Sequence, residues 1–190
     1  TLTEINDLLA GNSSGTLTFN ANSDTPAASA TLTLAIDDGG NTGLGGALTA
    51  NDAAVIVITA INDAPVLTVP GAQTVNENGS LALTGGTVIS IADADSGAQD
   101  IRFEVSAAHG KLTLASVAGL TFFVGDGTSD VSMTFTGTLA AINMALATVT
   151  YVPNTSYNGS DSVSVLVNDL GQQGTGGANT DTDSIAITVN

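Results

Sequence analysis

Polar and apolar residues alternate with a period of two along much of this chain. Residues 31–36 read Thr-Leu-Thr-Leu-Ala-Ile, and the same alternation runs through 131–136 and 162–167. Successive side chains of a β-strand point to opposite faces, so the pattern predicts strands with one buried and one solvated face. Strands that end a repeat are predicted at 55–58 and 185–189, and further strands near 66–69, 81–84, 87–91, 101–105, 111–114, 121–124 and 148–152.

Turn signals separate these predicted strands. Asp-Gly or Asn-Gly pairs occur at 38–39, 78–79, 126–127 and 158–159, and a Gly-Gly pair occurs at 85–86. Such pairs favour tight turns between neighbouring strands. Short strands at this spacing predict an all-β fold, an Ig-like β-sandwich.

One stretch departs from the period of two. Apolar residues follow Thr138 at helical spacing, and a second set follows Thr1 in the same way. A threonine is a suitable N-cap for a helix. We therefore predict a short helix that crosses between the sheets in both places, formed around Leu139, Ile142, Asn143 and Leu146 and around Leu2, Ile5, Leu8 and Leu9.

The two helical stretches belong to an internal repeat. Residues 1–6 return as 138–143, 17–19 as 149–151, 36–38 as 167–169, and 45–47 as 176–178. Counted from Asn62 to Asn190, the period is 128 residues. Residues 1–64 are therefore interpreted as the C-terminal half of one repeat and residues 65–190 as one complete repeat, joined at the Asn62-Asp63 step.

The half repeat 1–64 lacks counterparts of the strands predicted within 66–136. Residues 1–64 therefore cannot make a complete sandwich alone. Either a preceding stretch of a longer chain supplies the missing strands, or another molecule donates them, since strand addition to an open edge is a known mode of association. We expect the first of these, with the chain being a window cut from something much longer.

The charge of the chain restricts its partners. Lys and Arg total 2 against 18 Asp and Glu, for a net charge of −16. Such a charge repels nucleic acid and anionic lipid, so neither is an expected partner. The sequence also contains no apolar run long enough for a membrane-spanning helix, so membrane insertion is not expected.

Catalysis is not expected from these residues. The chain has one His, His109, and no Cys, which leaves few arrangements for a nucleophile and its base. We interpret His109 as a residue at a strand end or on the surface. Two Tyr, five Phe and no Trp provide a poor platform for stacking sugar rings. We therefore predict that the protein is not an enzyme.

Carboxylates are the remaining candidates for chemistry. Asp93 and Asp95 are two residues apart in a predicted turn, where their side chains can converge on one ion. The joint adds Asn62 and Asp63, and the loop after residue 167 adds Asp169. Ca²⁺ takes six to eight hard oxygen ligands from such groups and from backbone carbonyls. This set predicts a calcium site at one pole of the complete repeat.

Several motifs resemble the calcium-binding signature of cadherin-like repeats. They are 61–65 (Ile-Asn-Asp-Ala-Pro), 75–78 (Val-Asn-Glu-Asn), 93–95 (Asp-Ala-Asp) and 167–169 (Val-Asn-Asp). The whole of 65–190 resembles the tandem repeats of very large bacterial calcium-binding surface adhesins. That resemblance also rests on 108–112 (Ala-His-Gly-Lys-Leu) and 125–128 (Gly-Asp-Gly-Thr), and it covers essentially the whole chain.

The resemblance implies a role for each candidate ligand. Calcium ions would lie at the joint, held by Asn62, Asp63, Asp93, Asp95 and Asp169. Two further residues would serve other joints, Glu77 the one that begins at Asn190 and Asp38 the preceding one. The acidic linker of cadherins is shortened here to Asn62-Asp63, and their acidic pair within the domain has no certain counterpart, so fewer ions per joint are expected.

The predicted function is structural. A calcium-stiffened extracellular spacer of a giant adhesin or surface fibre fits these features, with neighbouring repeats of the same chain or other copies of it as partners. A host or surface ligand would be bound by domains outside this chain. Two alternatives remain, a self-assembling extracellular filament subunit completed by strand donation and a module that binds carbohydrate or protein.

Overall fold

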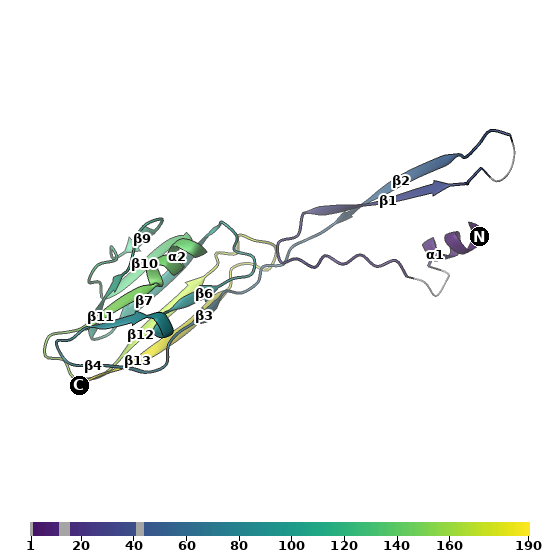
Figure 1. Ribbon diagram of the computed structural model, residues 1–190. Coiled ribbons are helices and arrows are strands. Elements are labelled where there is room, and N and C mark those ends of the chain that lie inside the picture. Colours follow the sequence, from purple (N-terminus) through teal and green to yellow (C-terminus); the bar gives the residue numbers. More distant parts are fainter. Residues whose placement is uncertain (1, 12–15, 41–43) are drawn as a thin grey trace. The chain divides into compact units, whose positions relative to one another are not determined.

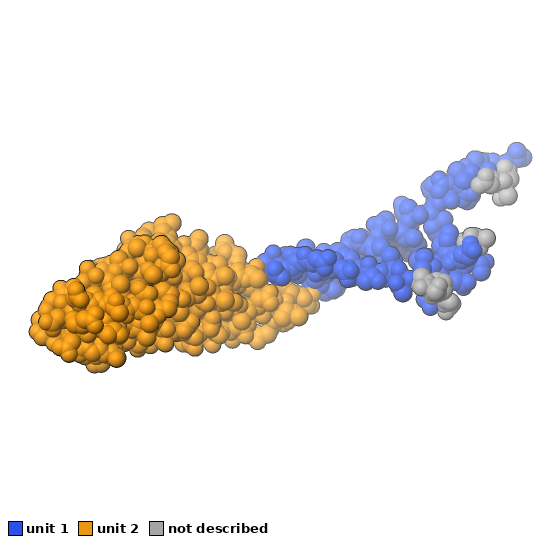
Figure 2. Space-filling view, turned by 60° about the horizontal axis from the view of Figure 1, so that its bottom comes forward, with its two compact units in different colours: residues 1–58 blue, residues 59–190 orange. Residues whose placement is uncertain are grey.

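The computed structural model describes residues 2–11, 16–40 and 44–190. These residues form two compact units, unit 1 (Thr1–Ile58) and unit 2 (Thr59–Asn190), coloured separately in Figure 2. Each unit is described by itself. The predicted N-cap Thr1 lies outside the described residues. None of the described helices is long and apolar enough to cross a membrane.

Unit 2 is built from β-strands in several sheets, and the predicted all-β class is confirmed (Figure 1). Its six-stranded sheet has the order β4-β13-β12-β7-β10-β9, a three-stranded sheet has the order β5-β11-β8, and β3 pairs with β6. The strands are β3 (Val66–Thr68), β4 (Gln73–Val75), β5 (Leu81–Thr84), β6 (Ser90–Ala92), β7 (Asp100–Ala107), β8 (Gly110–Leu114), β9 (Thr121–Val124), β10 (Ser132–Thr138), β11 (Thr148–Pro153), β12 (Gly159–Asn168) and β13 (Thr180–Val189).

The period-two pattern explains how these strands pack. Alternate residues of β12 and β7 are buried, which places one face of the six-stranded sheet in the core. The other wall of the core comes from β5, β8 and β11 through Leu83, Leu112, Val149 and Tyr151. Burial of these apolar side chains between the two sheets is the main source of stability of the sandwich.

The short helix predicted after Thr138 is present as α2 (Leu139–Leu146). The Thr138 hydroxyl accepts a hydrogen bond from the Ala141 amide at 3.2 Å, as an N-cap residue does. Asn143 on this helix donates from Nδ2 to the Ile91 carbonyl and accepts the Ile91 amide at Oδ1, both at 2.9 Å. The polar residue in the helical stripe therefore ties α2 to strand β6.

The local pattern misses one strand and misplaces another. β4, at Gln73–Val75, is too short for an alternation to be recognised, and it pairs in parallel with β13. The predicted strand at 87–91 begins instead with the 3₁₀ turn η1 (Gly85–Thr87), and strand β6 follows it.

Unit 1 contains helix α1 (Leu2–Leu9) and a hairpin of β1 (Ser29–Asp37) and β2 (Thr49–Val57). None of its described residues is buried. The hairpin has the pairing register of β12 and β13 when residue numbers are raised by 131, the separation of Asp38 and Asp169. Leu32 pairs with Ala54, for example, as Val163 pairs with Ile185. The repeat seen in the sequence is therefore also a repeat of strand pairing.

The joint residues do not follow that offset. Asn62 and Asn190 are 128 residues apart, so three residues, 59–61, are additional in the first copy. Ala60 and Asn62 form hydrogen bonds with Thr175 in the glycine-rich loop 171–177 of unit 2. We predicted a division between residues 64 and 65, whereas the two compact units divide between Ile58 and Thr59.

Candidate metal centre at the start of the second unit

The connecting residues 60–62 lie along the glycine-rich loop 171–177. Ile61 forms a parallel bridge with Thr175, the Asn62 amide donates to the Thr175 carbonyl at 2.8 Å, and the Thr175 amide donates to the Ala60 carbonyl at 2.9 Å. Gly174 has φ +80°, and a Cβ there would lie 2.8 Å from backbone atoms of Ala60 and Ile61. Only glycine permits this close approach.

The side chain of Asn62 continues the attachment. Its Nδ2 donates to Asp169 Oδ2 at 2.7 Å and to the Gly177 carbonyl at 3.0 Å. Asp169 Oδ1 accepts the amides of Gly171 at 2.9 Å and Asn179 at 2.8 Å. Both Asn62 and Asp169 are buried. Asp169 therefore shapes the loop between β12 and β13 and holds Asn62 against it.

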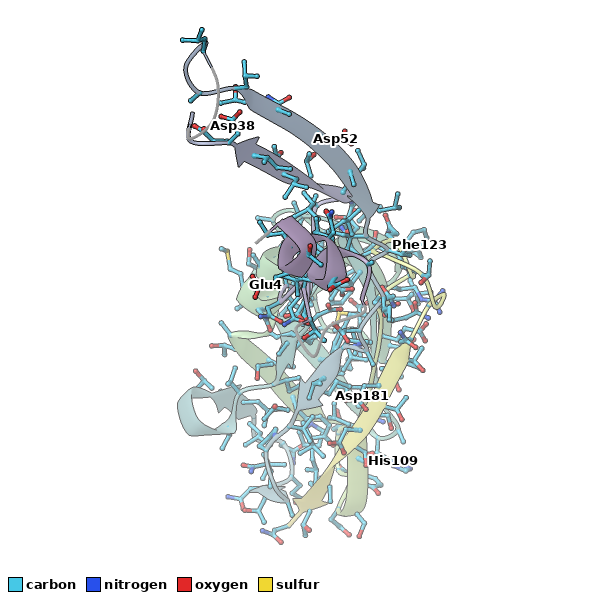
Figure 3. All side chains as sticks on the ribbon, turned by 90° about the vertical axis from the view of Figure 1, so that its right-hand side faces the viewer. Glu4, Asp38, Asp52, His109, Phe123 and Asp181 are labelled. Atoms are coloured by element: carbon cyan, nitrogen blue, oxygen red, sulfur yellow. The ribbon has the colours of Figure 1, made fainter. Side chains whose placement is uncertain are left out.

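Asp38 has the same local role in unit 1. Its Oδ1 accepts the amides of Gly40 and Leu48, each at 2.9 Å. These two bonds, that from Leu48 first, lower the pKa of the Asp38 carboxyl. Figure 3 shows Asp38 at the turn end of the hairpin. A loop-organising carboxylate at this position is thus common to both copies.

Asp93 and Asp95 meet in the loop after β6. Asp93 Oδ1 accepts the amides of Asp95 at 3.1 Å and Ser96 at 2.9 Å, which forms an Asx turn. Asp95 Oδ2 accepts the Asp63 amide at 3.1 Å. The other two oxygens, Asp93 Oδ2 and Asp95 Oδ1, are buried and have no hydrogen-bond partner among the described residues.

This pair of carboxyl groups is electrostatically unfavourable as it stands. Asp95 is only 2% exposed. Burial, followed by the neighbouring Asp95 carboxyl group, raises the pKa of the Asp93 carboxyl. Two neighbouring carboxylates in a buried site cannot both stay ionised at low cost. Either a proton shared between them or a bound cation must relieve the repulsion.

The seven predicted ligands form separate groups. Asp93 and Asp95 converge, Asp63 reaches them through its backbone amide, and Asn62 pairs with Asp169. Glu77 lies near the far end of β13, where its amide donates to the Asn190 carbonyl at 2.7 Å, and Asp38 is in unit 1. Within 2–11, 16–40 and 44–190, no group of three or more His, Asp or Glu side chains converges in a way that could hold an ion. Metal binding by these residues stays a prediction.

Sequence reasoning missed a third buried carboxylate, Asp161 on β12. Its Oδ2 accepts the Tyr151 hydroxyl at 2.7 Å and the His109 amide at 3.0 Å, and His109 Nδ1 lies 3.5 Å from Oδ1. The His109 ring is half exposed and stacks on Tyr157 at 4.2 Å between ring centroids. The buried phase of β12, extended back from Val163, falls on Asp161, and this was the available signal.

The hydrogen bonds set the charge state of this cluster. Burial alone would raise the pKa of Asp161, but the bonds from Tyr151 and from the amides of Ser162 and His109 outweigh it, so the pKa is lowered. Burial, and then the Asp161 carboxylate, raise the pKa of the Tyr151 hydroxyl. Asp161 is thus held as an anion that ties His109, just before β8, to β11 and β12.

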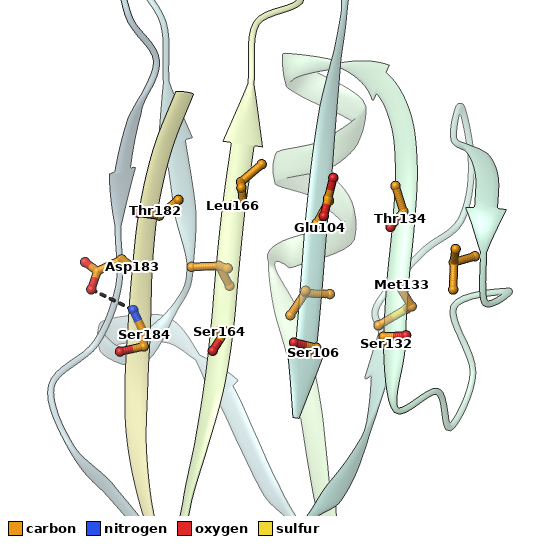
Figure 4. Close-up of a pocket in the computed structure, with 13 residues that line it drawn as sticks. Glu104, Ser106, Ser132, Met133, Thr134, Ser164, Leu166, Thr182, Asp183 and Ser184 are labelled. Atoms are coloured by element: carbon orange, nitrogen blue, oxygen red, sulfur yellow. Dashed lines mark hydrogen bonds between the residues drawn. The ribbon is translucent and has the colours of Figure 1, made fainter. Parts of the chain in front are cut away.

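The solvent-facing side of the six-stranded sheet is hollowed. Four serines lie in register across it, Ser184 on β13, Ser164 on β12, Ser106 on β7 and Ser132 on β10. They line a hollow of about 720 Å³ (Figure 4). None of the thirteen described residues that line it is aromatic, so the stacking surface typical of sugar binding is missing there.

Comparison with known proteins adds little to this picture. No protein-family model matches the chain, and no curated protein matches it. The solved structures to which it is similar include three with 16% sequence identity or less. One is AggA, the major subunit of aggregative adherence fimbriae type I from Escherichia coli, with 16% identity over 68% of this chain and 98% of that one and a TM-score of 0.37. Another is a cohesin module from a Clostridium perfringens family 33 glycoside hydrolase, with 11% identity over 70% of this chain and 100% of that one and a TM-score of 0.36. A third is an ASH/PapD-like domain of human CEP192, with 7% identity over 68% of this chain and 87% of that one and a TM-score of 0.33. At such scores the likeness carries no argument about function.

Proposed function

We propose that this chain is a non-catalytic structural segment of an extracellular array of β-sandwich repeats, stiffened by Ca²⁺ bound at Asp93 and Asp95. The two buried carboxylate oxygens without partners, Asp93 Oδ2 and Asp95 Oδ1, carry the calcium part of the proposal. The repeat of strand pairing between the hairpin of unit 1 and β12–β13 carries the structural part. The extracellular location rests on the resemblance to surface adhesins.

The donor atoms suit calcium. Carboxylate oxygens, backbone carbonyls and water are the ligands Ca²⁺ takes, and the ion tolerates irregular geometry. A bound cation would supply the positive charge that the pair lacks. The chain has only two basic residues in total, Arg102 and Lys111, and Arg102 forms an ion pair with Glu104 at 3.0 Å. Two carboxylates are fewer than a complete calcium shell, so backbone and water oxygens would provide the rest.

Calcium at this pair would act on the connecting segment through one contact. Asp95 Oδ2 accepts the Asp63 amide, so an ion that orders the Asp95 side chain also orders Asp63. Asn62 is held independently by Asp169 and by the loop around Thr175. Residues 60–63, near the start of unit 2, would then be held to the rest of that unit, and bending at those residues would be suppressed.

Thermal unfolding of the 190-residue chain with millimolar Ca²⁺ and with chelator tests the calcium site. Both tyrosines, Tyr151 and Tyr157, lie in unit 2, so near-ultraviolet circular dichroism of tyrosine reports this unit. A ligand present at about 100 times its dissociation constant raises the free energy of unfolding by about 2.7 kcal/mol. For a unit of this size that corresponds to roughly 8–10 °C in Tm. The double variant Asp93→Asn/Asp95→Asn should lose this rise, and Asp183→Asn, an exposed carboxylate on β13, should keep it.

The pH dependence separates a cation from a shared proton. A folded-state pKa of Asp93 that is raised means that the folded unit takes up a proton more readily than the unfolded chain. In chelator, stability should therefore rise as the pH falls through the raised pKa of Asp93, and Ca²⁺ should abolish that rise. A Tm that is the same with Ca²⁺ and chelator at neutral pH would refute the calcium site and leave a plain β-sandwich spacer.

One observation favours a second candidate function, a filament subunit completed by other copies. Unit 1 exposes apolar residues on both strands of its hairpin, including Leu34, Ile36 and Val57. If another copy covers them, the isolated chain should form concentration-dependent polymers in light scattering, and Leu34→Asp should return it to monomers. A monomeric chain at high concentration would favour the spacer.

A further inference from the structure

The hairpin of unit 1 is the counterpart of a hairpin whose partners are known. In unit 2, β12 is bonded on its outer edge to β7, and β13 is bonded on its outer edge to β4. Those two strands belong to the front half of the repeat, residues 65–137. The hairpin β1–β2 repeats the β12–β13 register at an offset of 131, so the edges of β1 and β2 correspond to edges that are filled in unit 2.

Apolar residues of β1 are exposed where their counterparts on β12 are buried. Val165 of β12 is 3% exposed, and its counterpart Leu34 of β1 is 39% exposed. The same contrast holds between Val167, which is fully buried, and Ile36. On this face lies an apolar hollow of about 220 Å³ whose lining includes Leu9, Leu17, Leu32 and Leu34. The hollow lies on the apolar face that corresponds to the core side of β12 and β13.

We propose that the free edge of β1 binds a front half of the same repeat type, of which residues 65–137 are the example on this chain. The occupant adds an antiparallel strand with the pattern of β7 along β1. The register follows from β12: Ala107 pairs with Val163, Val105 with Val165 and Phe103 with Val167. The incoming strand therefore places its alanine, valine and phenylalanine opposite Leu32, Leu34 and Ile36.

Charge supports the same register. Arg102 pairs with Asn168 in unit 2. The counterpart of Asn168 is Asp37 in β1, so an incoming strand of this type places its arginine opposite a carboxylate. Opposite charges on directly paired residues stabilise antiparallel pairs, and like charges destabilise them. The acidic hairpin of a chain with net charge −16 thus favours a strand that carries arginine at this position.

This inference rests on the repeat architecture in the proposed function and not on calcium. It requires only a copy of residues 65–137 that is not already paired with strands equivalent to β12 and β13. A second copy that pairs hairpin to hairpin along β1 would cover the same edge, and that occupant is an outcome of the test.

The test is a chain in which a second copy of residues 65–137 is fused before Thr1. The junction reproduces the natural sequence order, because residues 1–6 match 138–143, which follow residue 137. Hydrogen exchange followed by mass spectrometry compares β1 amides in the fused and unfused chains. We expect at least a hundredfold slower exchange of β1 in the fused chain. The matched control carries Val105→Asp in the added copy only and should exchange like the unfused chain.

Cysteine pairs then test the register, since the chain has no cysteine of its own. Leu34→Cys with Val105→Cys in the added copy should form a disulfide, because the corresponding residues 165 and 105 are direct partners. Ala35→Cys with the same Val105→Cys should not, because its side chain points to the opposite face. Three results would each overturn the proposal. The first is fast exchange of the β1 amides in the fused chain, and the second is a disulfide at residue 35 instead of 34. The third is a Leu34→Cys dimer of the unfused chain that persists after fusion.

These outcomes are independent of the calcium site. Exchange is measured in β1 with chelator present, whereas calcium binding is read from the tyrosines of unit 2. Loss of the calcium effect therefore leaves this inference intact, and its own failure leaves the Asp93–Asp95 site intact.

Discussion

Ile56 and Ile187 provide an internal comparison of the same residue in two surroundings. They occupy equivalent positions at the offset of 131, Ile56 on β2 opposite Ala30 and Ile187 on β13 opposite Asp161. Ile187 is 1% exposed and belongs to the core of unit 2. Ile56 is half-buried. Replacement of each by alanine removes the same atoms, so any difference in cost reports the surroundings.

The expected costs follow from burial. An Ile→Ala change removes about three methylene-sized groups, each worth about 0.8 kcal/mol when fully buried. For Ile187 the cavity left in a closed core adds to this, for a total of about 3–4 kcal/mol in the free energy of unfolding of unit 2. For Ile56, half the burial and an open site that leaves no cavity give about 1 kcal/mol, confined to unit 1.

Two assays on the same variants separate the units. Urea unfolding followed by tyrosine fluorescence measures unit 2, and hydrogen exchange of β1 and β2 amides measures the hairpin. Ile187→Ala should shift the urea midpoint strongly, and Ile56→Ala should leave it unchanged. In the chain fused to a second front half, the cost of Ile56→Ala should rise to about 3 kcal/mol, as the site becomes a closed core. Equal costs at the two positions in the unfused chain would refute the idea that Ile56 is exposed because unit 1 lacks the strands that bury Ile187 in unit 2.

Two further predictions concern the buried Asp161 cluster. Tyr151→Phe removes the hydroxyl that donates to Asp161, which should cost about 1.5–3 kcal/mol and lower Tm by roughly 5–10 °C, whereas Tyr157→Phe should have little effect. The lowered pKa of Asp161 contributes stability at neutral pH, and this stability is lost as the pH falls through that pKa. In Tyr151→Phe the pKa of Asp161 should rise, so acid unfolding should begin at a higher pH. An unchanged acid unfolding profile would contradict this. Gly110→Ala places a Cβ against the Tyr151 ring and should lower the free energy of unfolding in urea by about 1–3 kcal/mol. Gly71→Ala, whose Cβ meets nothing within 4 Å, is the control.

The two polar attachments of the connecting segment differ in what they need. The Asn62–Asp169 contact is complete in itself, because the oxygens of Asp169 accept three hydrogen bonds from protein groups. The contact of Asp63 with Asp95 includes a carboxylate oxygen that no described protein group satisfies. A cation is therefore expected to act at the second attachment, while the first holds with or without it.

The local pattern of the sequence determined the strands, the helix and the repeat. Alternation located β1, β10 and β12. In β10 and β12 every second residue is buried as predicted, whereas β1 has no buried residue. Helical spacing behind Thr138 located α2. The matched segments around Asp38 and Asp169 anticipated that the two copies share a hairpin, and the shared register follows from the equal spacing of strand and loop.

The tertiary structure decided which polar groups meet. Asp93 and Asp95 were expected to converge with Asn62, Asp63 and Asp169 on ions, but the fold sets them as a pair and engages Asp169 in its own loop. Sequence spacing limits how far apart residues can be, but the direction of each side chain depends on contacts with distant segments. The parallel pairing of β4 with β13 and the burial of Asp161 against Tyr151 depend on such contacts too. Local periodicity reports only whether a face is buried, whereas the partner that buries it is selected by long-range packing.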